Sequence, residues 1–172
     1  RKAWAERLSF GFRADRGETV RYMEFLISQG EINEAFQVWK TRLQEEGFSP
    51  LSETDLIVNG DFEKDGILGG GFDWKIGKAS GTEISFDPSI APEGKRSLKI
   101  VFTGKENVDF QHVSQAVALK PNTDYVLSAN MKTQAVTTKS GVRIEVLGAG
   151  QAFQKGSETL TGDNEWKKLI VN

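Results

Sequence analysis

The chain contains no cysteine among its 172 residues and only one histidine, His112. The absence of cysteine excludes disulfides, thiolate metal sites and cysteine nucleophiles. A single histidine leaves only one candidate base for a histidine-dependent triad. No apolar run of about 18 residues occurs, so this stretch of sequence contains no candidate membrane span. The net charge of −2 gives no electrostatic reason to expect nucleic acid as a partner.

Motifs of common catalytic sites are also missing. Gly-x-Ser-x-Gly does not occur, and the glycines at 69–71 lack the Lys and Ser/Thr of a phosphate-binding loop, so we interpret them as a mobile turn. Asp and Glu are plentiful, but no feature singles out a pair suited to glycoside hydrolysis. We therefore predict a protein that is not an enzyme.

Glycine is distributed unevenly. Only four of the 18 glycines precede residue 48, which predicts a helical first part and a second part rich in turns. We expect one domain over residues 1–50 and another over residues 54–172. The chain begins without an initiator Met or a signal peptide and ends in an apolar stretch, so we expect it to be a piece of a longer protein.

The first part carries local signals for helices. A capping box over Asp15–Glu18 and a glycine suited to the left-handed position, Gly30, predict a helix that ends near Gln29. A second helix ends at Gly47, and residues 1–12 predict a further short one. The apolar face of the second helix has the spacing i, i+3, i+4, i+7 and i+11 and consists of Ile32, Ala35, Phe36, Trp39 and Leu43.

The junction of the two helices, from Phe25 to Ala35, resembles the turn of tetratricopeptide-type repeats. The resemblance covers one unit, whereas such arrays need about three units to bury their faces. Two interpretations are open. The helical hairpin is either the last repeat of a longer array, which would offer a surface to a protein partner, or it packs against the following domain.

From Thr54 onward the apolar period falls to two, as in β-strands. About nine short strands separated by turns predict an antiparallel β-sandwich. The fold class is therefore α+β, with a helical hairpin followed by the sandwich. The expected strands cover residues 55–58, 72–76, 82–86, 97–102, 108–119, 124–132, 141–147, 152–159 and 165–171.

Several phrases of the second part resemble, in the same order, those of the family 4 and family 9 carbohydrate-binding modules. The resemblance implies a galactose-binding-like jelly roll over about residues 56–172, without the family's closing strand, which would lie beyond Asn172. It also implies a polysaccharide or oligosaccharide partner and an extracytoplasmic, bacterial protein. The phrases are Leu56–Glu63, Phe72–Trp74, Glu93–Ile100, Ser114–Tyr125 and Asn164–Lys168.

Sugar-binding sandwiches stack aromatic rings on pyranose faces and bind the hydroxyls with polar side chains. Alternation along the strand at 108–119 places Phe110 and His112 outward. Asn130, Arg143 and Glu145 have outward parity on other strands, and Trp74 would flank the groove from its loop. Alternatives are open: Trp74 packs in the core, the charged pair is a solvated face, or the helical hairpin covers Phe110 and leaves no glycan site.

The resemblance further implies a structural calcium ion where the opening strand meets the Gly-x-x-Ser-Leu phrase. Its ligands would be Asp61, Glu63 and the carbonyl of Lys95 or Ser97. Calcium takes six to eight oxygen ligands, among them carboxylates and backbone carbonyls. The alternative is that the two carboxylates are ordinary turn and edge residues.

The sequence thus predicts a non-catalytic module for polysaccharide recognition, attached to a helical-repeat region. A second hypothesis is a structural protein that scaffolds an envelope or exopolysaccharide assembly without binding sugar. A third is a lectin-like appendage of a hydrolase.

Overall fold

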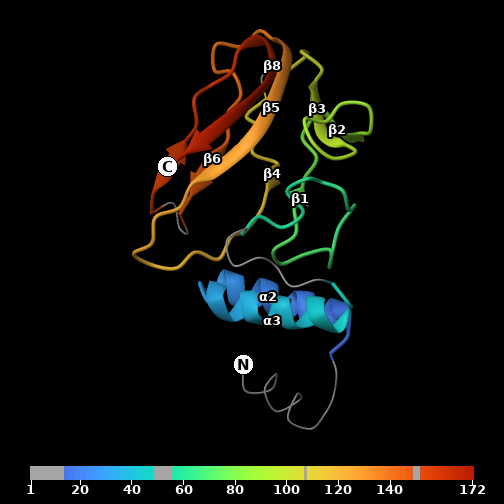
Figure 1. Cartoon of the computed structure of the whole chain (residues 1–172), viewed down its shortest axis with the longest axis vertical. Coiled ribbons are helices and arrows are strands. Elements are labelled where there is room, and N and C mark those ends of the chain that lie inside the picture. Colours follow the sequence, from blue (N-terminus) through green and yellow to red (C-terminus); the bar gives the residue numbers. More distant parts are fainter. Residues whose placement is uncertain (1–13, 49–55, 107, 149–151) are drawn as a thin grey trace. The chain divides into compact units, whose positions relative to one another are not determined.

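The computed structural model describes residues 14–48, 56–106, 108–148 and 152–172. These residues form two helices followed by eight strands, and every strand pairing is antiparallel (Figure 1). The predicted α+β class is confirmed. No helix within these ranges is long and apolar enough to cross a membrane. The helix predicted over residues 1–12 lies outside the described residues.

Contacts divide the chain into two compact units, Arg1–Leu119 and Lys120–Asn172. The domain boundary that the sequence suggests, near residues 50–54, stays a prediction.

The helices begin and end where their local signals place them. α2 covers Arg16–Ser28 and α3 covers Ile32–Glu45. The side chain of Asp15 accepts the Glu18 N–H at 2.7 Å, and the Glu18 carboxylate accepts the Asp15 N–H at 3.1 Å, which confirms the capping box. Gly30 follows the end of α2 with a φ of 77°, the left-handed conformation that glycine adopts at little cost.

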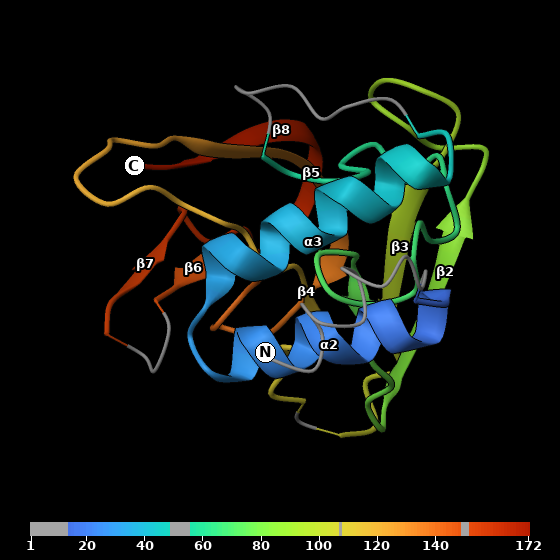
Figure 2. The same ribbon diagram turned by 90° about the horizontal axis from the view of Figure 1, so that it is seen from below.

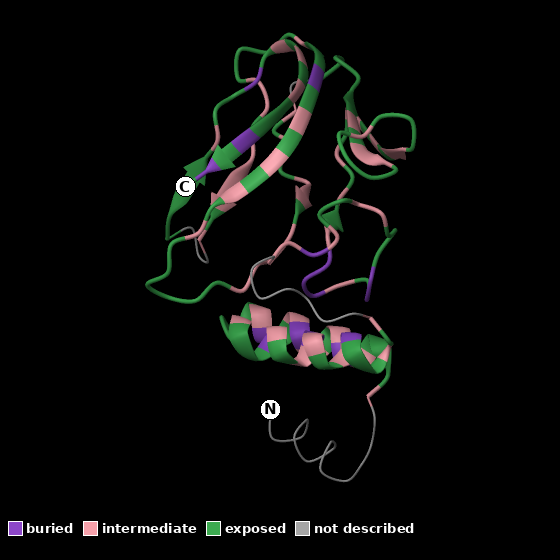
Figure 3. Ribbon diagram, viewed as in Figure 1, coloured by how far each residue is buried: buried purple, intermediate pink, exposed green. Residues whose placement is uncertain are grey.

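α2 and α3 lie side by side and share one apolar core with the segment that follows them (Figures 2 and 3). Trp39 is fully buried, 6.1 Å from the ring of Phe36 and 5.9 Å from that of Phe72. The hairpin therefore packs against the following part of the chain, and a longer helical array stays a prediction. The buried members of this core are Met23, Leu26, Ala35, Trp39, Leu43, Val58, Ile67, Leu68 and Phe72.

Two of the glycines at 69–71, Gly70 and Gly71, pack against the helices, whereas Gly69 is exposed. An ideal Cβ at Gly70 would lie 2.5 Å from Cγ1 of Val20. Gly71 is buried with a φ of 68°, and a Cβ there would lie 3.1 Å from Cε of Met23. Glycine is needed here because the backbone itself approaches the side chains of α2.

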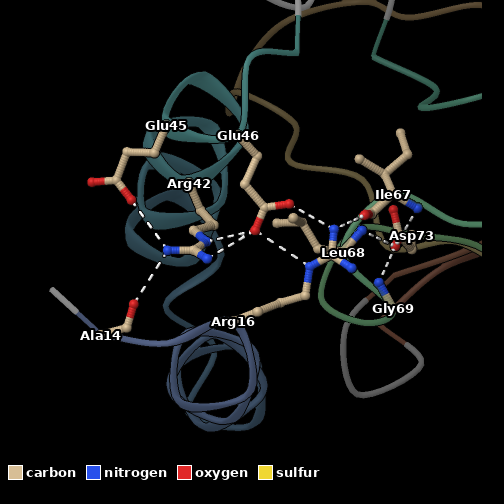
Figure 4. A network of polar contacts seen from close by, with 9 residues as sticks. All are labelled: Ala14, Arg16, Arg42, Glu45, Glu46, Ile67, Leu68, Gly69 and Asp73. Carbon is tan, nitrogen blue, oxygen red and sulfur yellow. Dashed lines mark hydrogen bonds and ion pairs between the residues drawn. The ribbon is translucent and has the colours of Figure 1, made fainter.

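A buried carboxylate holds the same loop in shape (Figure 4). Oδ2 of Asp73 accepts the backbone N–H groups of Ile67, Leu68 and Gly69 at 3.1, 2.7 and 2.6 Å. The side chain of Arg16, on α2, donates to the carbonyl of Ile67 at 2.8 Å. Hydrogen bonds thus fix the loop both internally and to the first helix.

The same arginine continues into an ion-pair network with α3. Arg16 lies 2.6 Å from the Glu46 carboxylate, which Arg42 also contacts at 2.9 Å. The hydrogen bond from Arg16 lowers the pKa of Glu46 below its usual value, and the same bond raises the pKa of Arg16. Both groups are therefore charged at neutral pH.

The strands of the first unit are fewer and shorter than the apolar pattern predicts. β2 (Thr82–Asp87) pairs with β3 (Ser97–Phe102), which confirms the strands predicted at 82–86 and 97–102. The predictions at 72–76 and 108–119 were too long, because the ladder is limited to β1 (Lys75–Ile76) and β4 (Val113–Ser114).

The strand predicted at 55–58 is wrong for the described residues 56–58. Instead of a neighbouring strand, the side chain of Gln115 satisfies the backbone of Val58. It accepts the N–H at 2.9 Å and donates to the carbonyl at 2.7 Å. An amide side chain can replace a ladder in this way because it offers one donor and one acceptor.

The second unit is built on a long antiparallel pair, β5 (Leu127–Val136) with β8 (Gly162–Val171). Register shifts interrupt this pair on either side of Thr133. Half-buried and exposed residues alternate along β5, as the sequence predicts (Figure 3). A shorter pair joins β6 (Glu145–Leu147) to β7 (Gln154–Gly156), each within a longer predicted strand.

The ladders of the described residues join the strands two by two into four sheets, β1–β4, β2–β3, β5–β8 and β6–β7. The antiparallel pairing of these strands is the one that the sequence predicts. Closure into a two-sheet jelly roll stays a prediction.

Candidate functional site

Phe110 and His112, which directly precede β4 in the strand predicted at 108–119, lie in contact with each other. The rings of Phe110 and His112 are 5.3 Å apart, and Phe102, the last residue of β3, meets Phe110 edge-on at 5.5 Å. Phe110 and His112 are half-buried, whereas Phe102 leaves 40% of its surface exposed. We call these three residues the aromatic cluster. In this cluster the partly exposed ring of Phe102 lies against the half-buried ring of Phe110, which also contacts His112.

His112 is fixed by its backbone. Its carbonyl accepts the Gly77 N–H at 2.7 Å, and an ideal Cβ at Gly77 would lie 3.5 Å from Cβ of His112. Nδ1 of His112 is buried and has no hydrogen-bond partner among the described residues. Leaving such a group unpaired costs about 1–3 kcal/mol, which a buried water molecule would offset.

Trp74 lies elsewhere. Its indole N–H donates to the carbonyl of Asn59 at 3.0 Å, and its ring packs 5.0 Å from that of Phe62. Ile76 is paired with Val113, so alternation places Trp74 on the Val113 side of the β1–β4 pair and His112 on the other side. The structure therefore does not bring Trp74 into the aromatic cluster.

The cavity beside Trp74 is too small for a sugar. It measures about 20 Å³, little more than the space of one water molecule. These contacts favour the packing interpretation of Trp74, and its role in ligand binding stays a prediction.

The other predicted contacts belong to the second unit. Asn130 is exposed on β5, opposite Lys168 on β8. Nε of Arg143 donates to the Glu145 carboxylate at 2.6 Å, so the structure brings this pair together. Arg143 and Glu145 line an open, mostly polar groove of about 360 Å³, together with Gln154, Gly156 and Ser157.

The residues predicted to bind calcium are bonded to one another. Oδ1 of Asp61 accepts the Glu63 N–H at 3.2 Å, and Oε1 of Glu63 accepts the Lys95 N–H. The Ser97 hydroxyl donates to the carbonyl of Ile90. Within the described ranges, no three or more acidic or histidine side chains gather into a metal-binding group.

A calcium site would need six to eight oxygen ligands. As arranged, one carboxylate oxygen of Asp61 and one of Glu63 each accept a backbone N–H, so an ion here would have to share or replace these hydrogen bonds. Calcium binding stays a prediction.

Comparison with known proteins identifies the second part of the chain. A family model described as a carbohydrate binding domain, of the combined family 4 and 9 type, matches residues 54–171. The chain belongs to this family. Searches of curated proteins and of solved structures gave no significant match. The match confirms the resemblance and supports a saccharide as the partner. Both helices precede the matched range.

Within this carbohydrate binding domain, Phe102 is the residue that sequence reasoning missed. Strand alternation groups it with Leu98 and Ile100 on one face of the strand. Both of those residues are half-buried, whereas Phe102 lies at the end of β3, opposite Thr82 at the first position of β2, and is partly exposed. An aromatic residue at the end of a strand, followed by Thr-Gly, is the signal that would have marked it.

Proposed function

We propose that the carbohydrate binding domain recognises polysaccharide without catalysis, and that a sugar ring packs against the aromatic cluster at Phe102 and Phe110. The observation that carries the proposal is the partly exposed aromatic cluster in a domain of a carbohydrate-binding family. An aromatic face attracts the apolar face of a pyranose, and nearby polar groups fix its orientation.

The cluster is suited to this role because its rings are held before a ligand arrives. The rings of Phe102 and Phe110 meet edge to face at an interplanar angle of 83°, and His112 flanks Phe110. Ordering these rings in advance lowers the entropy lost on binding.

The polar groove at Arg143 and Glu145 supplies the second predicted set of contacts. Its volume of about 360 Å³ lies in the lower part of the range of about 300–1,000 Å³ typical of ligand sites. Charged and amide side chains such as Gln154 suit sugar hydroxyls, because they offer several donors and acceptors. Asn130, also exposed, remains a predicted contact.

We expect the module to work outside the cytoplasm of a bacterium, where polysaccharides are accessible, and to be attached to a helical-repeat region through its hairpin. Support for the location comes from the family, whose members are often extracellular. Support for the attachment comes from the tetratricopeptide-like junction between α2 and α3.

Affinity electrophoresis through gels that contain soluble polysaccharides, and sedimentation with insoluble ones, would test the proposal. Calorimetry on the retained polysaccharides would then compare Phe102→Ala and Phe110→Ala with the wild type. Losing a stacked ring removes about 1.5 kcal/mol or more of apolar contact, so each variant is expected to bind about 10-fold more weakly.

Phe153→Ala is the matched control, because Phe153 is also exposed, at 48%, but belongs to the other unit. Far-ultraviolet circular dichroism would verify that the three variants fold. Retention equal to the wild type for both cluster variants would refute the assignment of the site. Release of reducing ends from a bound polysaccharide would refute the absence of catalysis.

A further inference from the structure

The junction between residues 59–65 and the start of β3 is built around one side chain, Arg96. Its Nε donates to the carbonyl of Phe62, and a terminal nitrogen lies 2.7 Å from Oδ1 of Asp65. Its guanidinium also lies 4.4 Å from the ring centre of Phe86, on β2. Only 19% of the side chain is exposed. One cation therefore joins three segments of the chain.

The segment that Arg96 contacts also carries the carboxylates that a structural cation would use. Asp61, Glu63 and Asp65 concentrate negative charge on one short segment. Glu63 turns toward the start of β3 and accepts the Lys95 N–H. The turn is shaped for this contact, because a Cβ at Gly94, whose φ is 79°, would lie 2.7 Å from Oε1 of Glu63.

The unpaired polar atom at this junction is a donor. The second terminal nitrogen of Arg96 is buried and has no partner among the described residues. Such a donor is satisfied by one more oxygen and repelled by a metal ion. A calcium ion on the carbonyl of Phe62 would lie within about 5 Å of the guanidinium, since both would contact the same oxygen.

We propose that Arg96 supplies the positive charge of this junction, so that the domain keeps it closed without calcium. The proposal concerns the cation that the family resemblance implies and does not depend on the sugar site. It explains why Glu63 and the Phe62 carbonyl are already bonded to N–H groups of residues 95 and 96.

Thermal unfolding of the whole chain, followed by circular dichroism in about 5 mM calcium and in excess chelator, is the first test. That concentration exceeds the dissociation constants of extracellular calcium modules, on the order of 10⁻⁴–10⁻³ M. We expect the same Tm in both buffers. A site with a dissociation constant of about 10⁻⁴ M would raise the Tm by about 5–9 °C, and a rise of this size would overturn the proposal.

Arg96→Met, which keeps the apolar stem and removes the charge, is the second test. Its Tm is expected to fall by at least about 5 °C, because the change removes the charged hydrogen bond to the Phe62 carbonyl and the contact with the Phe86 ring. Arg143→Met is the matched control: Arg143 is paired with Glu145 but is 48% exposed, so its Tm should change by no more than about 2 °C. Equal shifts in the two variants would overturn the proposal. If Arg96→Met does not fold, the wild-type calcium comparison still decides.

Discussion

Gly70 and Val20 offer a direct test of the packing between the glycine loop and α2. Gly70→Ala adds one methyl group, which would lie 2.5 Å from Cγ1 of Val20 unless one of the two moves. The φ of Gly70 is outside the left-handed region, so backbone strain does not contribute. Overpacking of this kind costs about 1–3 kcal/mol in the free energy of unfolding.

Truncating Val20 should remove the loss in free energy of unfolding that Gly70→Ala causes. Val20→Ala deletes Cγ1 and leaves Cβ at 3.8 Å from the added methyl, an ordinary contact distance. Because Val20 is only half-buried, its truncation alone should cost about 1 kcal/mol. The double variant is therefore expected to resemble Val20→Ala, and the coupling between the two substitutions to be about 1–3 kcal/mol.

Urea unfolding, followed both by helical circular dichroism and by tryptophan fluorescence, would measure the four free energies. Gly66→Ala is the control, because a Cβ at Gly66 meets nothing within 4 Å and the φ of this residue is not left-handed. Free energies that add within about 0.5 kcal/mol, or a Gly70→Ala variant as stable as Gly66→Ala, would refute the packing of the loop on α2.

Two further predictions concern carboxylates. Asp73→Ala leaves the three N–H groups at 67–69 without their acceptor and should lower the free energy of unfolding by about 3 kcal/mol or more. Asp73→Asn keeps one acceptor oxygen and should lower it less. Urea unfolding measures both variants, and an Asn variant less stable than the Ala variant would contradict the role of Asp73. Hydrogen bonds from the hydroxyl and N–H of Ser89, and then from Lys99, lower the pKa of Asp87 to about 2. Ionised Asp87 therefore stabilises the fold above its unfolded pKa of about 4, and this contribution is lost as the pH falls to about 2. The Tm difference between wild type and Asp87→Asn should shrink over that range, and a constant difference would contradict the assignment.

The helices could be predicted from the sequence because their signals are local. The capping box at Asp15, the glycine at 30 and the apolar spacing up to Leu43 each depend on residues within a few positions of one another. The strand ladders depend on distant residues. Gln115 has the parity of a strand residue, yet its side chain bonds the backbone of Val58, 57 positions away, and no alternation pattern encodes that contact.

The candidate site shows the same limit. Alternation along one strand predicts that Phe110 and His112, two residues apart, share a face. The side on which Trp74 lies depends instead on how β1 pairs with β4, over two residues only. Sequence reasoning listed Lys95 and Ser97 as calcium ligands and passed over Arg96 between them. A family resemblance marks positions for a metal, whereas the contacts of Arg96 with Phe62 and Asp65 become visible only with the side chains in place.

The shared core of the hairpin and the segment at 58–72 has a practical consequence for anyone who expresses or fuses the sugar-binding part. A fragment cut at the family boundaries, 54 and 171, would lose Trp39 and Met23 and would expose Val58 and Phe72 to water. Exposed apolar patches of this kind promote aggregation, and a failed binding assay on such a fragment would report on solubility and not on specificity. The transferable unit for a probe or a fusion therefore includes α2 and α3.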